Sequence, residues 1–133
     1  MSVDYATVEG SYDRCLENNG FYDTFYEKFL AKSEEIPPLF ANTDFRRQKQ
    51  MIRMSVRMMV RLGAGEDGTK LAISKLGESH SRRQHNIRPE LYGLWLDALC
   101  ESIAQCDPEY TPELEQQWRD TMQAGIEMMI SMY

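Results

Sequence analysis

Apolar residues recur at helical spacing along nearly the whole chain, and no segment alternates between apolar and polar residues as a half-buried strand would. The clearest stripe lies in residues 21–30, where large apolar side chains fall at positions i, i+3, i+4, i+7 and i+8. These residues are Tyr22, Phe25, Tyr26, Phe29 and Leu30. The pattern predicts an all-α protein whose second helix has an aromatic face.

Helix-breaking residues divide the first third of the chain. A first helix is expected from about Val3 to Glu17, because Asn18-Asn19-Gly20 is a strong helix stop. After the aromatic stripe, Pro37-Pro38 forces the chain out of regular helix, and Leu39-Phe40 is expected in a short turn or a one-turn helix.

The middle of the chain predicts one long helix. Thr43 or Asp44 can cap it, and it runs to about Leu62 before a glycine-rich loop over residues 63–68. One face of this helix repeats at i, i+4, i+7 and i+11, and consists of Gln48, Ile52, Ser55 and Met59.

Three further helices are expected in the second half. A short one carries Ile73, Leu76 and His80 on one side, the next opens with Pro89 at a first helical position, and the last begins at Thr111-Pro112. We therefore predict a single domain over residues 1–133, built from six to seven helices.

Charge and hydropathy exclude several classes of function. The chain carries 15 Lys and Arg against 21 Asp and Glu, and this net charge of −6 gives no general attraction to nucleic acid or to an anionic membrane. Arginines interrupt every long apolar stretch, so no membrane span is expected. The N-terminus does not resemble a signal peptide, and we expect a cytoplasmic protein.

The three cysteines, Cys15, Cys100 and Cys106, suggest neither a disulfide framework nor a zinc site, because their number is odd and no Cys-x-x-Cys occurs. A covalently attached haem is not expected either, since the Cys-x-x-Cys-His motif is missing.

The two histidines, His80 and His85, are the candidate metal ligands. His80 ends a helix whose inner face is otherwise aliphatic, and haem iron takes such a neutral imidazole held away from water. His85 lies five residues further on, about 140° around a helix, so the two are not expected to bind one iron from the same side. Arg83 and His85 could meet haem propionates or could simply be exposed.

The chain resembles the globin superfamily, in particular the bacterial single-domain haemoglobins and the globin domain of flavohaemoglobins. On the distal side of the haem, residues 25–30 resemble the second-helix motif whose tyrosine is Tyr26, and Phe40, fourteen residues on, resembles the corner phenylalanine. Gln48 with Ile52 resembles the distal glutamine and its aliphatic partner.

The proximal side of the resemblance comprises Leu76-Gly77 followed by His80, which is 32 residues beyond Gln48. Residues 87–92, which include Ile87 and Tyr92, resemble the turn into the next helix, and Trp118 stands where bacterial globins often carry a tryptophan. The resemblance covers roughly residues 21–129 and implies a three-over-three helical sandwich around a pocket for haem b.

Two departures from the family pattern affect this interpretation. The connection from His80 to Pro89 is about two residues longer than in those relatives, so the role of His85 does not carry over. The stretch from Phe40 to Gln48 needs a one-residue insertion, without which Arg47 would take the distal position.

The resemblance implies reversible binding of O₂ or NO, with CO as a further small ligand. His80 would be the proximal iron ligand, and Tyr26 and Gln48 would donate distal hydrogen bonds. NO dioxygenation with a separate reductase, gas sensing through a partner chain, electron transfer by a His/Met haem and a haem-free helical bundle are alternatives. The protein is expected to be a monomer or a weak homodimer.

Overall fold

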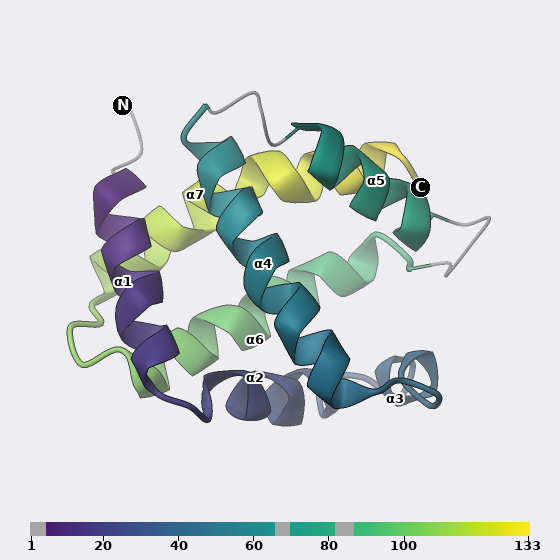
Figure 1. Ribbon diagram of the computed structural model, residues 1–133, viewed down its shortest axis with the longest axis horizontal. Helices are drawn as coiled ribbons and strands as arrows, with labels where there is room; N and C mark the ends of the chain where they lie inside the picture. The colour runs from purple at the N-terminus through teal and green to yellow at the C-terminus, as the bar shows by residue number, and fades with distance from the viewer. Residues whose placement is uncertain (1–4, 66–69, 82–86) are drawn as a thin grey trace.

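A computed structural model describes residues 5–65, 70–81 and 87–133, which form seven α-helices and no strand (Figure 1). The helices are α1 (Tyr5–Glu17), α2 (Phe21–Leu30), α3 (Ile36–Leu39), α4 (Phe45–Gly63), α5 (Lys70–His80), α6 (Glu90–Cys106) and α7 (Pro112–Ser131). Among the helices of these ranges, none combines the length and the apolar character that crossing a membrane requires.

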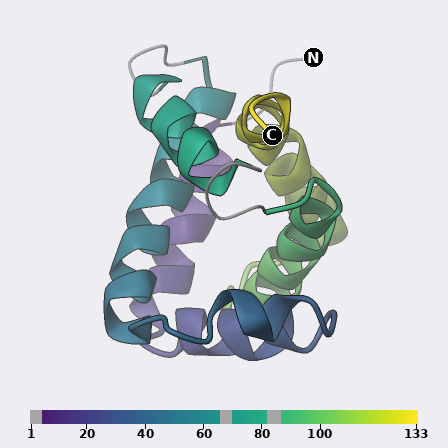
Figure 2. The same cartoon turned by 90° about the vertical axis from the view of Figure 1, so that its right-hand side faces the viewer.

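Six of these helices pack as two layers of three, the three-over-three globin-like sandwich that the sequence predicts. One layer contains α1, α4 and α5, and the other contains α2, α6 and α7. Figure 2 shows α4 and α5 on one side and α6 and α7 on the other, with α2 and α3 closing the lower end. The helix α4 crosses α7, and α2 lies against α6.

The aromatic stripe of α2 forms the centre of the core at this lower end. Phe25 is fully buried, its ring is stacked on Phe29 at 5.6 Å between centroids, and it meets Trp95 of α6 edge-on at 6.1 Å. Burying a side chain of this size contributes about 1.5–3 kcal/mol to folding. The stripe therefore fixes α2 against α6, as its spacing predicts.

Two predicted helix starts are confirmed by their capping hydrogen bonds. The Asp44 carboxylate accepts from the Arg46 backbone N–H at 3.1 Å, so Asp44 rather than Thr43 caps α4. The Thr111 hydroxyl accepts from the Leu114 N–H at 3.0 Å at the start of α7. Each cap satisfies an N–H that has no partner inside its helix.

The helices next to the prolines begin at slightly different residues than predicted. Pro37 and Pro38 do not break the chain before a turn but stand in the first positions of the one-turn helix α3. A first helical turn tolerates proline because its N–H groups have no intrahelical acceptor. Pro89 directly precedes α6, which begins at Glu90, one residue later than predicted.

Gly63 allows α4 and α7 to come close where they cross. A Cβ atom placed on it would lie 2.1 Å from the Thr121 carbonyl oxygen, which is far inside van der Waals contact. This close crossing holds the end of α4 against α7.

Candidate functional site

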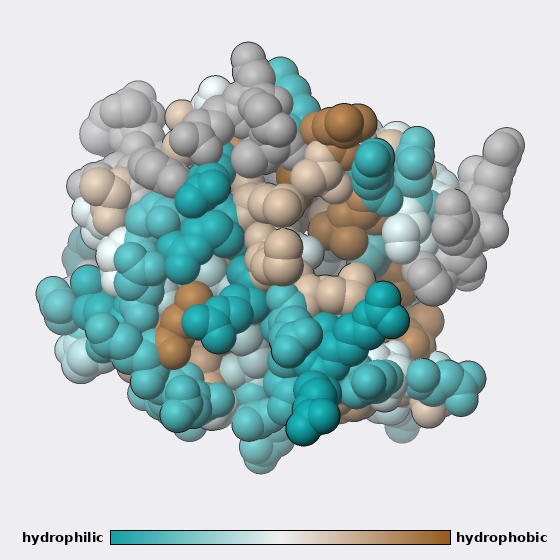
Figure 3. All heavy atoms as spheres, in the orientation of Figure 1, coloured by the Kyte–Doolittle hydropathy of each residue, from teal (hydrophilic) through white to brown (hydrophobic). Residues whose placement is uncertain are grey.

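A cavity of about 290 Å³ lies between the two layers, bounded by α2, α4, α5, α6 and α7. Apolar side chains gather around a hollow between α4 and α5 on the face shown in Figure 3. The cavity is lined by Tyr26, Phe29, Leu39, Phe40, Thr43, Gln48, Met51, Ile52, Ser55, Met59, Leu76, Ser79, His80, Ile87, Leu91, Tyr92, Trp95 and Met129.

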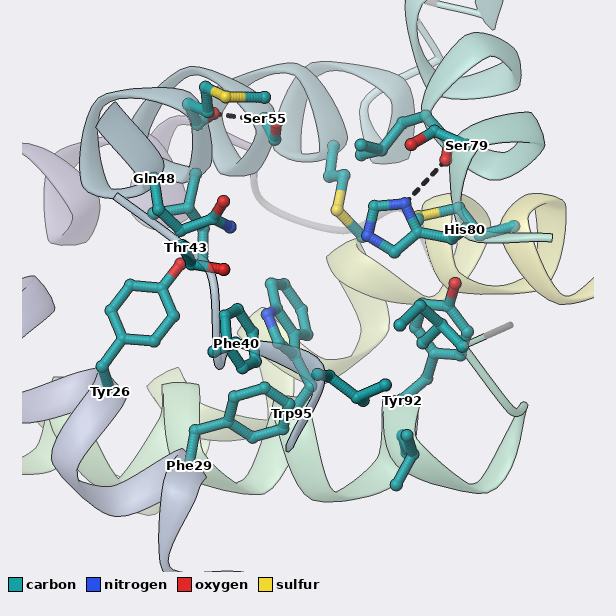
Figure 4. A pocket seen from close by; sticks show the side chains of 18 residues that line it. Tyr26, Phe29, Phe40, Thr43, Gln48, Ser55, Ser79, His80, Tyr92 and Trp95 are labelled. Atoms are coloured by element: carbon teal, nitrogen blue, oxygen red, sulfur yellow. Dashed lines mark hydrogen bonds between the residues drawn. The ribbon is translucent and has the colours of Figure 1, made fainter. Parts of the chain in front are cut away.

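His80, at the last position of α5, presents its imidazole to this cavity (Figure 4). Its Nδ1 lies 2.8 Å from the Leu76 carbonyl oxygen. Because a carbonyl only accepts, Nδ1 carries the proton and donates, and Nε2 is the nitrogen with the lone pair. The backbone of α5 thus selects the tautomer that suits metal binding through Nε2.

Tyr26, Thr43 and Gln48 lie across the cavity from His80 (Figure 4). The Tyr26 hydroxyl is buried and finds no hydrogen-bond partner among the described residues. Burial raises the pKa of Tyr26 to about 12. The Gln48 side chain is close enough to oppose part of that rise as a hydrogen-bonding neighbour, but it does not meet the geometry of a direct hydrogen bond to the hydroxyl. The phenol therefore stays protonated at neutral pH, as a hydrogen-bond donor aimed at the cavity.

Aromatic rings form the wall between these two polar groups (Figure 4). Phe40, which follows α3, meets Tyr26 edge-on at 5.8 Å between centroids and is stacked on Phe45 at 5.7 Å. Tyr92 and Trp95 of α6 line the same space, and burial raises the pKa of Tyr92 to about 12. The wall thus offers flat apolar surface beside a single imidazole.

Eight of the ten predicted site residues are brought together here. They are Tyr26, Phe40, Gln48, Ile52, Leu76, His80, Ile87 and Tyr92. The other two, Arg83 and His85, lie outside the described residues. Arg47, the alternative to Gln48 in the other register, is exposed and does not line the cavity. Its position agrees with the one-residue insertion before Gln48.

The sequence does not predict the other ten lining residues as part of the site. Three of them, Phe29, Ser55 and Met59, already stand on predicted helix faces, so their periodicity is the available signal. Leu39 and Met51 gave no such signal, because both are exposed, at 39% and 50% of their surface, while lining the mouth.

The cavity can hold one metal through one protein ligand, with little other charge near it. No Asp, Glu, Lys or Arg is among its lining residues in the described ranges. Nor do those ranges bring three His, Cys, Asp or Glu side chains together as a metal site. A metal bound here therefore has to arrive with most of its ligands already in place.

Comparisons with known proteins agree with this architecture. A model of the globin family matches residues 12–129. The crystal structure of protein PA3967 from Pseudomonas aeruginosa PAO1, described as structurally highly homologous to a human haemoglobin, superposes with a TM-score of 0.92. The two sequences are 42% identical, and the match covers 97% of each chain. No curated protein sequence matches the chain.

Proposed function

The chain belongs to the globin family, and we propose that it is a haem protein that reversibly binds O₂ or NO, with His80 as the iron ligand. We take residues 1–133 as one globin domain and haem b as the bound form. The observation that carries the proposal is the pairing, across one apolar cavity, of the His80 imidazole with the buried, partnerless hydroxyl of Tyr26.

The residues present fit a haem in three respects. The macrocycle supplies four of the iron's ligands, and the cavity supplies a single imidazole for a fifth. Phe40, Tyr92 and Trp95 offer apolar surface to a flat ring. The Tyr26 hydroxyl is a buried donor without a partner among the described residues, and a bound ligand could accept a hydrogen bond from it.

His80 is oriented by its own helix. The Leu76 carbonyl accepts from Nδ1 at 2.8 Å, which fixes the orientation of the ring. Iron held by His80 would supply the coordination chemistry that binds a diatomic gas, and Tyr26 and Gln48 line the same cavity. The protein contributes the orientation of the imidazole and the exclusion of water by the aromatic wall.

Tyr26 and Gln48 would act on a gas molecule in this cavity as hydrogen-bond donors. Bound O₂ carries partial negative charge on its outer atom, so a phenol and an amide both stabilise it. In a dry pocket, one such bond contributes about 1–3 kcal/mol. Loss of one donor should therefore speed O₂ release by roughly tenfold or more, whereas CO, which is less polar, should respond less.

The first test is spectroscopic. Recombinant protein reconstituted with haem is reduced with dithionite and then exposed to CO, and the visible spectrum is recorded at each step. A five-coordinate ferrous spectrum that changes on adding CO supports the proposal. Met51 and Met59 also reach the cavity, so a six-coordinate ferrous spectrum insensitive to CO would indicate a thioether as second ligand and electron transfer instead.

The second test isolates the iron ligand. His80→Gly should lose the iron–histidine bond, and added imidazole should restore the ferrous spectrum because it can enter the vacated space. Leu71→Gly is a matched control on the same helix, since Leu71 is 67% exposed and does not line the cavity. A ferrous spectrum that is the same in His80→Gly as in the unaltered protein would contradict the assignment.

We favour gas binding over NO dioxygenation as the activity of this chain. NO dioxygenation consumes electrons that a separate reductase must supply, whereas reversible gas binding needs only the haem and the residues that line the cavity. Sustained NO consumption by the oxygenated protein with a cellular reductase would overturn this preference.

A further inference from the structure

A second buried polar site lies away from the cavity, where α1 meets the start of α7. We call it the α1–α7 corner, and it consists of Ser11, Arg14, Asp107 and Trp118. The Trp118 indole N–H donates to the Ser11 hydroxyl at 2.9 Å, and that hydroxyl donates to Asp107 Oδ2 at 2.6 Å. Trp118 and Ser11 are fully buried, and Asp107 is 3% exposed.

A continuous series of aromatic contacts joins this corner to the cavity. Trp118 meets the Tyr12 ring edge-on at 5.8 Å between centroids, and the hydroxyls of Tyr12 and Tyr22 are 2.6 Å apart. Tyr22 and Tyr26 both contact the Phe25 ring, at 6.0 and 5.0 Å. Because Tyr26 lines the cavity, every step from Trp118 to the cavity is a contact between neighbouring side chains.

The charges along this series favour loss of an electron at one end. The Arg57 guanidinium lies 4.6 Å over the Tyr12 ring, and a cation on a ring opposes removal of an electron from it. Trp118 is instead hydrogen-bonded through Ser11 to a buried carboxylate, which favours positive charge on the indole. Asp107 itself is held by Arg14, whose Nε lies 2.7 Å from Oδ1.

We propose that Trp118 donates an electron to the haem cavity, along the side chains of Tyr12, Tyr22, Phe25 and Tyr26, when hydrogen peroxide oxidises the haem-loaded protein. This inference rests on the proposed function, because it requires a bound haem. It adds a second property, the removal of an oxidising equivalent from the gas-binding cavity into the interior of the protein.

Cleaving the O–O bond of hydrogen peroxide consumes two electrons, of which Trp118 gives one and the bound haem would supply the other. Two protons from solvent complete the conversion of the peroxide into two molecules of water. The oxidised indole loses its N–H proton to the Ser11 oxygen, while the Ser11 hydroxyl proton passes to Asp107. The product is a neutral indole radical beside a protonated carboxyl group.

The test is the identity of the protein radical. Haem-loaded ferric protein is mixed with an equimolar amount of hydrogen peroxide, frozen rapidly and examined by electron paramagnetic resonance, with and without ring-deuterated tryptophan. We expect a signal that narrows on deuteration. The signal should disappear in Trp118→Phe. Since the chain has two tryptophans, its loss there assigns it to Trp118 rather than to Trp95, which lines the cavity.

Two further variants distinguish electron transfer from a structural role. Tyr12→Phe keeps the ring but removes the hydroxyl shared with Tyr22, and should lower the yield of the indole radical and leave the oxidation on Tyr26. Ser11→Ala removes the proton acceptor, so the indole should keep its N–H, seen as a hyperfine coupling that changes in D₂O. A merely structural role for Ser11 would not produce that coupling.

Other outcomes of these experiments would contradict electron transfer from Trp118. An indole signal that persists in Trp118→Phe, or a radical yield unchanged in Tyr12→Phe, would overturn the proposal. If Trp118→Phe does not fold, Tyr12→Phe decides. Failure of the unaltered protein to bind haem, seen in its visible spectrum beforehand, would refute the proposed function itself and is thereby distinguished from failure of this inference.

Discussion

The cavity and the α1–α7 corner both bury polar groups, but they treat them in opposite ways. In the corner, Asp107 accepts from Arg14 and Ser11, and Ser11 accepts from Trp118, so each polar side chain has a protein partner. In the cavity, the Tyr26 hydroxyl is equally shielded from water and has none within the described residues.

This difference separates groups that stabilise the fold from groups that await a ligand. A buried donor without a partner costs about 1–3 kcal/mol, which a protein retains only where something else repays it. Removing a side chain from the corner should therefore destabilise the protein, whereas removing the Tyr26 hydroxyl should not. The unfolding free energies of haem-free variants test this contrast.

The largest effect is expected for Asp107→Ala. The substitution leaves the buried Ser11 hydroxyl without its acceptor and leaves Arg14 only the exposed Glu109 carboxylate, so the free energy of unfolding should fall by about 2–3 kcal/mol. Urea denaturation followed by circular dichroism measures it. Asp97→Ala is the control, because Asp97 pairs with Arg119 near the surface and should cost less than about 1 kcal/mol.

Ser11→Ala should have a somewhat smaller effect. It removes the acceptor of the Trp118 N–H, a group that has no access to water, and about 1–2 kcal/mol of unfolding free energy should be lost. Ser131→Ala is a suitable control, since Ser131 is exposed and its hydroxyl donates only to the Met128 carbonyl. Equal stabilities of the two variants would show that the corner contributes nothing.

Acid should weaken the corner. Burial opposes ionisation of Asp107, but the hydrogen bonds from Arg14 and Ser11 outweigh it and hold the pKa of Asp107 below its usual value. The stabilisation from this low pKa is therefore fully present above about pH 4, the ordinary value of an unfolded Asp, and is lost as the pH falls further.

Asp107→Asn tests that pH dependence directly. The unfolding free energy of this variant should vary less steeply below about pH 4 than that of the unaltered protein, because the titrating group is gone. Urea denaturation at a series of acidic pH values gives the two slopes. Parallel slopes would contradict a lowered pKa for Asp107.

The smallest effect on stability is expected for Tyr26→Phe. This variant removes a hydroxyl that lacks a partner in the described residues, so the unfolding free energy should stay the same or rise. In the haem-loaded protein, the same variant should release O₂ roughly tenfold or more faster. A marked loss of stability in the haem-free variant would show that the Tyr26 hydroxyl stabilises the fold, as the side chains of the corner do.

The sequence predicts the cavity better than the corner, and the reason is physical. His80, Gln48 and Tyr26 stand on amphipathic helices, so periodicity alone places them on inner faces, and the family resemblance gives their order. Ser11 and Asp107 are 96 residues apart, and Ser11 and Trp118 are 107 apart. No local pattern marks such pairs, because they meet only when α1 packs on α7.

Some features of the cavity could not be predicted from the sequence either. The choice between Arg47 and Gln48 depended on an insertion, and only the packing of α4 turns Gln48 inward and leaves Arg47 exposed. The hydrogen bond from His80 to the Leu76 carbonyl follows from their i, i+4 spacing, but the imidazole tautomer is apparent only from the geometry.

The most direct test of the central claim is a haem titration of the purified protein, followed by its Soret absorption, beside the same titration of His80→Gly. We predict stoichiometric uptake by the unaltered protein and a ferrous, CO-sensitive spectrum after reduction. In His80→Gly, that spectrum should return only when imidazole is added. A protein that takes up no haem, or whose spectrum does not depend on His80, would contradict the account.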